Sequence, residues 1–504
     1  MDTPPKNKGR LTANPYLWSF TTYFTEGFPY SIIRTISSVF FRDRGMSLEG
    51  IGLTSLFGLP WILKFLWGPH VDEFGTKRQW MLVMQGLLVL LFLATAFMVP
   101  LASAIQAIAV LFFIGSFIAA THDIAIDGYY MEALDAAGQS KFIGYRVMAY
   151  RIAMMTGTGV IVTIGTTVGW FPAFLSAGFL MAGFYLFHWF CLPRCETPGK
   201  PLADLVRSLA RLKVVVAAAT LALGVAGLRG LLASEFYAGL QARLPVLEQF
   251  NFPAWIGLLL FLSLILVALF RKRLQGLIYR DPDSFYARAF VSFMDRERIG
   301  AIIAFIILIR TGEFMLSAMA APFMVDLGIK VHYGWISGGV GLPASIAGAM
   351  LGGSLIGRHG LRRMVWLFLW AQNITNIVYM VLALFLAKYL AVNTGAATPV
   401  PIGSANLMAV IVVHGFDQFA GGLGTAILMT YLMRLCKPDY KAAHYAIGTG
   451  LMSVSGLYAG VLSGFLAAWL GYGTFFGISF LMSLPGMALV ALVPGMGDKR
   501  VTAS

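Results

Sequence analysis

Apolar stretches of about 20 residues recur from one end of this 504-residue chain to the other. A bilayer offers no water to the backbone, so only helices and closed barrels can cross it. A barrel strand would alternate between polar and apolar residues, whereas the apolar runs here are continuous. Mean hydropathy is +0.76, and charged residues make up 12% of the chain, against about 25% in an ordinary soluble domain. The sequence therefore predicts an all-α polytopic membrane protein.

Six predicted spans precede a basic connector and six follow it. They cover residues 16–41, 49–71, 79–99, 104–133, 141–168 and 171–193, then 299–325, 334–357, 364–389, 405–435, 441–469 and 472–493. The connector, residues 194–298, contains two further apolar stretches at about 214–240 and 253–270. The prediction is thus 14 spans, with an N-terminal bundle at 16–193, a C-terminal bundle at 299–493, and polar tails at 1–15 and 494–504.

Two loops of matched spacing indicate that the two bundles are related. Residues 68–78 read Gly-Pro-His-Val-Asp-Glu-Phe-Gly-Thr-Lys-Arg, and residues 353–363 read Gly-Ser-Leu-Ile-Gly-Arg-His-Gly-Leu-Arg-Arg. The second loop has Gly357 where the first has Asp72. One such loop alone would mark only a cytoplasmic turn, but two copies between apolar spans favour an internal duplication. Parallel repeats of six helices are one of the known transporter plans.

The distribution of lysine and arginine predicts the orientation. With the N-terminus inside, inner segments hold 26 of the 37 basic residues and outer loops hold five. Both termini are therefore expected in the cytoplasm. The polar start, Met1–Asn14, lacks the apolar core of a signal peptide, so the first span is expected to stay in place.

Several function classes are disfavoured. The net charge of +14 has a topological explanation, and no basic face with interleaved aromatic residues suggests nucleic acid. Cys191, Cys195 and Cys436 form neither a disulfide framework nor a metal motif. No phosphate-binding GxxxxGK[ST] loop occurs, and no intramembrane histidine pairs with a nucleophile at ligand spacing. We expect no cofactor, no metal and no enzymatic activity.

Ionisable residues inside the spans follow a three-helix period. Each costs a few kcal/mol at the bilayer centre unless it faces a cavity or a partner. They concentrate in the first helix of each group of three, with fewer in the second and fifth spans: Glu26, Arg34, Lys64, His122, Asp123, Asp127, Arg146, Arg151, Arg310, Glu313, His414 and Asp417. The pattern predicts a central water-filled cavity, with every third helix facing lipid.

Four of these residues are candidate proton carriers: Glu26, Asp123, Asp127 and Glu313. Asp123 and Asp127 share one face of a helix because they are four residues apart. Asp127 alternatively forms a static ion pair with the next helix, or a latch with the basic loop. Arg310 and Glu313, three residues apart, either neutralise each other or form a proton site tuned by the arginine.

The remaining candidates serve binding and gating. The predicted substrate-binding residues are Arg34, Lys64, His122, Arg146, Arg151, Arg310, His414 and Asp417. For Lys64 the simpler explanation is that it reaches the headgroups, and for His414 that it is a packed, hydrogen-bonded residue. The predicted gating residues are Asp72, Lys77 and Arg78. Glycine pairs such as Gly157/Gly159, and the run 421–424, are expected to permit close helix packing.

Several motifs resemble one branch of the major facilitators, the peptide–acetyl-coenzyme A–drug transporter family, and within it the AmpG-like muropeptide permeases. The motifs are Gly27-Phe-Pro29, Lys64-Phe-Leu-Trp-Gly-Pro69 with Asp72, His122-Asp-Ile-Ala-Ile-Asp127, Gly144-Tyr-Arg146 and Gly421-Gly-Leu-Gly424. The resemblance implies proton-driven import of an anhydromuropeptide across the bacterial inner membrane. We also expect the protein to be a monomer. Asp123 and Asp127 match the family's acids in the fourth helix, and Glu313 lies where an acid is expected in the seventh.

One departure from the family keeps alternatives open. The two additional spans lie between the bundles here, whereas the AmpG-like permeases carry theirs after the twelfth span. Acetyl-coenzyme A or another anionic metabolite or drug is therefore an alternative cargo. A receptor or assembly factor on a transporter scaffold is the alternative of another class. The expected partners are a small-molecule substrate and membrane lipids.

Overall fold

The computed structural model describes residues 14–64, 67–68, 71, 74–101, 104–134, 136–194, 200–201, 204, 220, 223–224, 226–244, 247, 255, 285–396, 398–437 and 441–494. Within these residues the secondary structure is helical, apart from one isolated bridge between Phe74 and Lys200. Nine helical stretches in the described part are long and apolar enough to cross a membrane. The all-α membrane class is confirmed.

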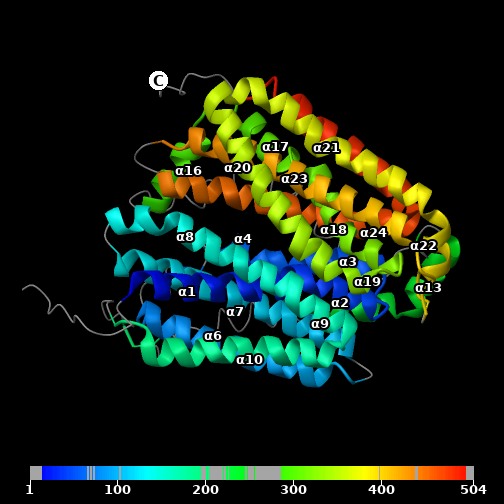
Figure 1. Cartoon of the computed structure of the whole chain (residues 1–504), viewed down its shortest axis with the longest axis horizontal. Coiled ribbons are helices and arrows are strands. Elements are labelled where there is room, and N and C mark those ends of the chain that lie inside the picture. Colours follow the sequence, from blue (N-terminus) through cyan, green and yellow to red (C-terminus); the bar gives the residue numbers. More distant parts are fainter. Residues whose placement is uncertain are drawn as a thin grey trace, which may run out of the picture.

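The N-terminal bundle follows the first six predicted spans. Its helices are α1 (Pro15–Tyr30), η2 (Ser31–Ile36) and α2 (Ser37–Asp43); α3 (Leu48–Leu53), η3 (Thr54–Gly58) and α4 (Leu59–Leu63); α6 (Lys77–Met98); α7 (Ala104–Ala133); α8 (Ala136–Met155), η5 (Thr156–Ile161) and α9 (Val162–Thr167); and α10 (Trp170–Cys191). Figure 1 shows these helices, blue to cyan-green, side by side in one half of the molecule.

The C-terminal bundle forms the other half (Figure 1). Its helices are α17 (Ile299–Leu308) and α18 (Thr311–Asp326); α19 (Lys330–Trp335), η7 (Ile336–Gly341) and α20 (Leu342–His359); α21 (Leu361–Phe385) with the short α22 (Ala387–Asn393); α23 (Ser404–Leu435); and α24 (Lys441–Leu489). The last helix bends at Gly471, whose φ of 72° separates the two predicted spans. The short helix α16 (Phe285–Met294) precedes this bundle.

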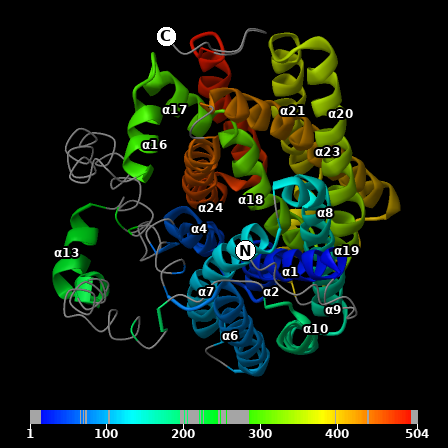
Figure 2. The ribbon, with the colours of Figure 1, turned by 90° about the vertical axis from the view of Figure 1, so that its left-hand side faces the viewer.

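Most of the two predicted connector spans lies outside the described residues. Where the first one is described, helix is interrupted at residues 233–234. The hydroxyl of Ser234 accepts a hydrogen bond from the backbone of Tyr237 and so caps a new helix, α13 (Glu235–Arg243). A continuous helix was expected there. Figure 2 shows α13 beside the two bundles and outside both.

Local sequence explains several helix boundaries. Asn14 caps α1, and Pro15 occupies the first helical position, where its missing N–H costs nothing. Thr76 and Gln79 form a reciprocal capping box at the start of α6. A π-helical segment, η2, begins two residues after Pro29. Such segments are frequent at functional sites.

The two ends of the molecule are named here after α1–α2: the Pro15 end, where α1 begins, and the Asp43 end, where α2 stops. Because the chain reverses at each turn, the α4–α6 and α20–α21 junctions lie at the Pro15 end. Large apolar side chains are exposed on α6, α10, α21 and the last part of α24, for example Phe97, Phe190 and Phe385. These are the helices predicted to face lipid, although α7, α8, α20 and α23 expose such side chains as well.

Candidate functional site

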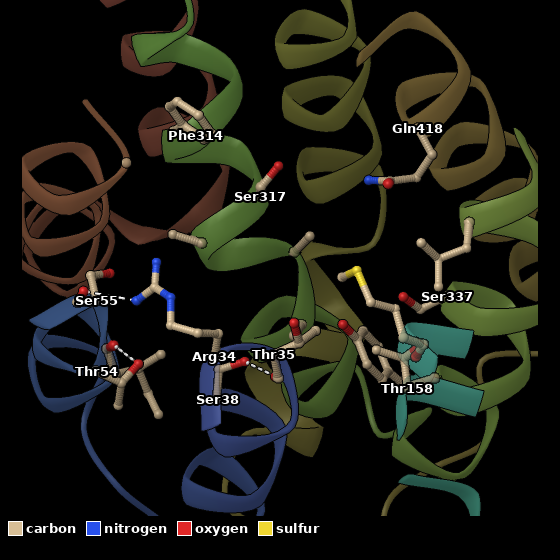
Figure 3. Close-up of a pocket in the computed structure, with 18 of the residues that line it drawn as sticks. Arg34, Thr35, Ser38, Thr54, Ser55, Thr158, Phe314, Ser317, Ser337 and Gln418 are labelled. Carbon is tan, nitrogen blue, oxygen red and sulfur yellow. Dashed lines mark hydrogen bonds between the residues drawn. The ribbon is translucent and has the colours of Figure 1, made fainter. Parts of the chain in front are cut away.

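A cavity of about 320 Å³ lies between the two bundles. Residues of η2, α2, η3 and η5 line it from the N-terminal bundle, and residues of α18, η7 and α23 line it from the C-terminal bundle (Figure 3). Three of these segments, η2, η5 and η7, are π-helical. None of the helices predicted to face lipid contributes a residue to this cavity.

Arg34 is the only charged side chain among the described residues lining this cavity. Its Nη1 donates a hydrogen bond to the backbone carbonyl of Ser55 at 2.8 Å. Gly58 leaves room for the guanidinium, because a Cβ there would lie 2.9 Å from its central carbon. Figure 3 shows the guanidinium beside Ser55. The arginine is thus held in place by a neutral group, which leaves its charge available to an anion.

The opposite wall of the cavity is polar and neutral. His414 is 3% exposed; its Nδ1 bonds to the Tyr379 hydroxyl at 2.9 Å, while its Nε2 has no partner. Gln418, on the next turn of α23, also lines the cavity, as does Ser337 on η7 (Figure 3). Asp417 is buried behind this wall and accepts a hydrogen bond from Gln418 at 3.2 Å. The wall therefore presents hydrogen-bonding groups that suit hydroxyls and amides.

A second cavity, of about 530 Å³, continues toward the Pro15 end. Tyr30, Met154 and Phe314 line both cavities and so form the boundary between them. The second cavity is more highly charged than the first. Its ionisable lining residues are Tyr23, Glu26, Tyr30, Arg146, Tyr150, Arg151 and Arg310.

Two carboxylate clusters in the N-terminal bundle each include a residue of α1. In the first, Lys64 Nζ lies 2.5 Å from Asp123 Oδ2, and the Glu26 carboxyl interacts with that of Asp123. One oxygen of Glu26, Oε2, is buried without a hydrogen-bond partner. Three ionisable groups from three different spans therefore meet in a cluster whose charges are not fully paired.

The second cluster contains Asp127. Its Oδ1 accepts a hydrogen bond from the Tyr23 hydroxyl at 2.8 Å and from Arg146 Nη1 at 3.2 Å. Arg146 also lies over the rings of Tyr23 and Tyr130 at 4.9 and 5.2 Å. The predicted ion pair between the fourth and fifth spans is thus present.

In the C-terminal bundle Arg310 and Glu313 form a bidentate ion pair, one of the two predicted arrangements. Arg310 lies at the break between α17 and α18, and its guanidinium stacks 5.0 Å from the Phe314 ring. Arg310 and Phe314 both face the second cavity. Glu313 therefore neutralises the charge of Arg310, although Arg310 itself lines the second cavity.

Three predicted residues lie elsewhere. His122 is buried, its Nε2 has no partner, and it lines neither cavity. Lys77 donates to the carbonyl of Val71 at 2.8 Å, and Arg78 donates to the carbonyl of Trp189 at 2.7 Å, so these contacts stay within the N-terminal bundle. Asp72, the third predicted gating residue, lies outside the described residues.

The sequence reading missed the contacts that join the bundles at the Asp43 end. Arg42 on α2 pairs with Asp326 on α18, and Asp43 pairs with Lys330 on α19 at 2.5 Å. Each acid has an additional donor from its own bundle: Tyr472 for Asp326 and Trp170 for Asp43. Acids and bases at the ends of the first and seventh spans were the available signal, but Arg42 and Lys330 contributed only to the prediction of membrane orientation.

Glycines form a second connection at the same end. A Cβ on Gly338 of η7 would lie 2.7 Å from the Cα of Gly159 on η5, so the two helices cross backbone to backbone. Gly52 on α3 likewise lies against Gly464 on α24. The expectation that glycine pairs permit close packing is confirmed at Gly159, and at Gly422, which lies against Ser345 and Ala349.

Two helical bundles of matching organisation around a central charged cavity define a secondary-transporter architecture. Comparison with known proteins agrees. The family model of the Major Facilitator Superfamily matches residues 19–294. The chain belongs to this superfamily, and it is a multi-pass membrane transporter, not an enzyme.

Several similar proteins are named as transporters. The anhydromuropeptide permease of Escherichia coli K12 is 24% identical over 93% of this chain and 77% of its own length. Putative transporter AmpG 4 of Rickettsia felis is 22% identical over 94% of both chains. Among solved structures, peptide transporter POT in complex with sulfate has a TM-score of 0.61 at 14% identity, covering 96% and 95% of the two chains. Nucleoside transporter NupG has a TM-score of 0.60 at 12% identity, covering 95% and 99%. The resemblance to AmpG-like permeases is confirmed.

Proposed function

We propose that this protein is a proton-coupled importer that carries an anionic or zwitterionic solute by alternating access, and that the solute is an anhydromuropeptide. The observation that carries the proposal is Arg34, a cation that faces the central cavity without a carboxylate among the described lining residues. The similarity to an anhydromuropeptide permease over 93% of the chain supports this choice of solute.

The chemistry of the cavity suits such a ligand. A muropeptide combines carboxylates with sugar hydroxyls and peptide amides. Arg34 would bind a carboxylate through charge-assisted hydrogen bonds. His414, Gln418 and Ser337 on the opposite wall would bind hydroxyls and amides. The second cavity, with Arg151 and Arg146, would extend the path toward the Pro15 end.

The distribution of basic residues supports placing the Pro15 end and both termini in the cytoplasm of a bacterial inner-membrane protein. The two connector stretches would then complete 14 spans. In this orientation the ion pairs Arg42–Asp326 and Asp43–Lys330 would close the outer side. The conformation described here would be the inward-facing one, and separation of these pairs would open the cavity outward.

Proton coupling is assigned to the cluster of Glu26, Asp123 and Lys64. Two carboxyls that share one lysine cannot both be fully compensated, so uptake of a proton by one of them relieves repulsion. Protonation of Asp123 would release Lys64, and Glu26 of this cluster lines the second cavity. Asp127 and Glu313, each already paired with an arginine, are the secondary candidates.

The test is uptake of radiolabelled anhydromuropeptide by right-side-out membrane vesicles that contain the protein. Uptake is expected when the outside is acidified and should collapse when a protonophore dissipates the gradient. Vesicles without the protein supply the background. Uptake that is equal with and without the gradient would overturn proton coupling alone. An absence of uptake, with labelled acetyl-coenzyme A transported instead, would overturn the assigned cargo.

A further inference from the structure

The junction between α20 and α21 encloses a basic hollow of about 630 Å³ at the Pro15 end. Its charged lining residues are Arg358 and His359 at the end of α20, Arg363 at the start of α21 and Arg434 near the end of α23. No acidic residue is among the described residues that line it. Because all four side chains belong to the C-terminal bundle, the hollow is separate from both cavities between the bundles.

The two loops of matched spacing, residues 68–78 and 353–363, differ in their charged residues. Position by position, Asp72 and Glu73 of the first copy correspond to Gly357 and Arg358 of the second, while the final basic pair is retained. The first copy thus has two acids, a lysine, an arginine and a histidine, whereas the second has three arginines and a histidine without an acid. The second loop therefore concentrates positive charge, and no acid within the loop balances it.

The retained arginines also differ in what they bind. Arg78 in the first copy donates to the carbonyls of His188 and Trp189 at the end of α10. Its counterpart Arg363 is exposed and lines the hollow, and neither it nor Arg358 forms an ion pair with any residue that the structure describes. Two guanidinium groups are therefore available to an external anion, and their planar donors match a phosphate.

The surroundings of the hollow indicate which phosphate it meets. Trp366 and Leu367, one turn along α21, are exposed at 42% and 61%, and Met433 beside Arg434 is exposed at 58%. Tryptophan and exposed apolar side chains next to a basic cluster are typical of a membrane protein's surface at headgroup level. A lipid bound here would place its headgroup in the hollow and its acyl chains along α21 and α23.

We propose that the hollow formed by Arg358, His359, Arg363 and Arg434 is a binding site for the phosphate of an anionic phospholipid. The site follows from the loss of both acids in the second copy of the duplicated loop. It is independent of the cargo and of proton coupling.

The test uses the full-length protein, purified in neutral detergent, with native mass spectrometry after addition of phosphatidylglycerol or phosphatidylcholine. The wild-type protein is expected to retain phosphatidylglycerol in preference to phosphatidylcholine. The double variant R358A/R363A should bind phosphatidylglycerol about thirtyfold more weakly, which corresponds to about 2 kcal/mol for two arginines. Arg362→Ala is the matched control, because Arg362 is exposed on the same turn and does not line the hollow.

Circular dichroism and gel filtration should show that each variant is folded as the wild-type protein is. Equal retention of phosphatidylglycerol by the double variant, or an equal loss in Arg362→Ala, would overturn the site. Equal retention of phosphatidylcholine would overturn its preference for anionic lipid. Displacement of the lipid by millimolar inorganic phosphate would overturn the lipid assignment in favour of a soluble phosphate compound.

Discussion

Arg42 of the N-terminal bundle donates two hydrogen bonds to Asp326 of the C-terminal bundle, from Nε to Oδ1 at 2.7 Å and from Nη2 to Oδ2 at 2.5 Å. The two side chains are only 13% and 5% exposed, and Tyr472 donates to the same carboxylate at 2.7 Å. These contacts join segments 284 residues apart in the sequence. Together with the pair of Asp43 and Lys330, they hold the bundles together at the Asp43 end.

Arg42→Ala should destabilise this closed end. Removing one partner of a buried ion pair costs about 3–5 kcal/mol, because the other charge stays buried. A cysteine introduced at Ser38, which lines the central cavity, should then react at least about tenfold faster with an impermeant thiol reagent added outside the cells. The charge-swapped pair R42D/D326R should restore slow labelling. Unchanged labelling in Arg42→Ala would argue against a gate here.

Gly338→Ala should also open the Asp43 end. The added Cβ would lie 2.7 Å from the Cα of Gly159, and backbone cannot move aside as a flexible side chain can. Overpacking of this kind costs about 1–3 kcal/mol, here in the closed conformation only. Gly339→Ala is the control, since its Cβ would meet nothing within 4 Å. Faster labelling of the same cysteine in Gly338→Ala, but not in Gly339→Ala, is the expected result.

Arg34→Ala should weaken binding of the anionic cargo without loss of stability. A hydrogen bond to a charged group contributes about 1.5–3 kcal/mol, so affinity should fall about tenfold to a hundredfold. Isothermal titration calorimetry of the purified protein with anhydromuropeptide measures this change directly. Arg44→Ala removes an exposed arginine at the end of the same span, outside the lining of the central cavity, and should leave affinity unchanged. Equal affinity in Arg34→Ala would remove this residue from the binding site.

Asp123→Asn should abolish uptake driven by the proton gradient. The amide cannot exchange a proton, and the partner of Lys64 loses its charge. Exchange of labelled for unlabelled cargo needs no net proton movement and should persist. Glu235→Gln, an exposed acid on α13, is the control and should transport as the wild-type protein does. Full gradient-driven uptake in Asp123→Asn would show that another group carries the proton.

Local patterns in the sequence predicted much of the candidate site. Arg310 and Glu313 are three residues apart, so their pairing follows from helical geometry alone. Asp127 and Arg146 lie on consecutive spans, which the turn between them brings together. The gating role of the basic loop stays a prediction, and spacing alone does not reveal the carbonyl groups that Lys77 and Arg78 meet in the folded bundle.

The sequence by itself determined the all-α membrane class and the positions of most of the apolar helices. Each of these depends on the free-energy cost of placing a polar group in hydrocarbon. That cost can be judged for each span from its own sequence. Only the tertiary structure decided that Lys64 pairs with Asp123 and Arg42 with Asp326, and that Arg34 is left to the cavity. The partner of a charge depends on how distant helices pack, and no periodicity within a span encodes that packing.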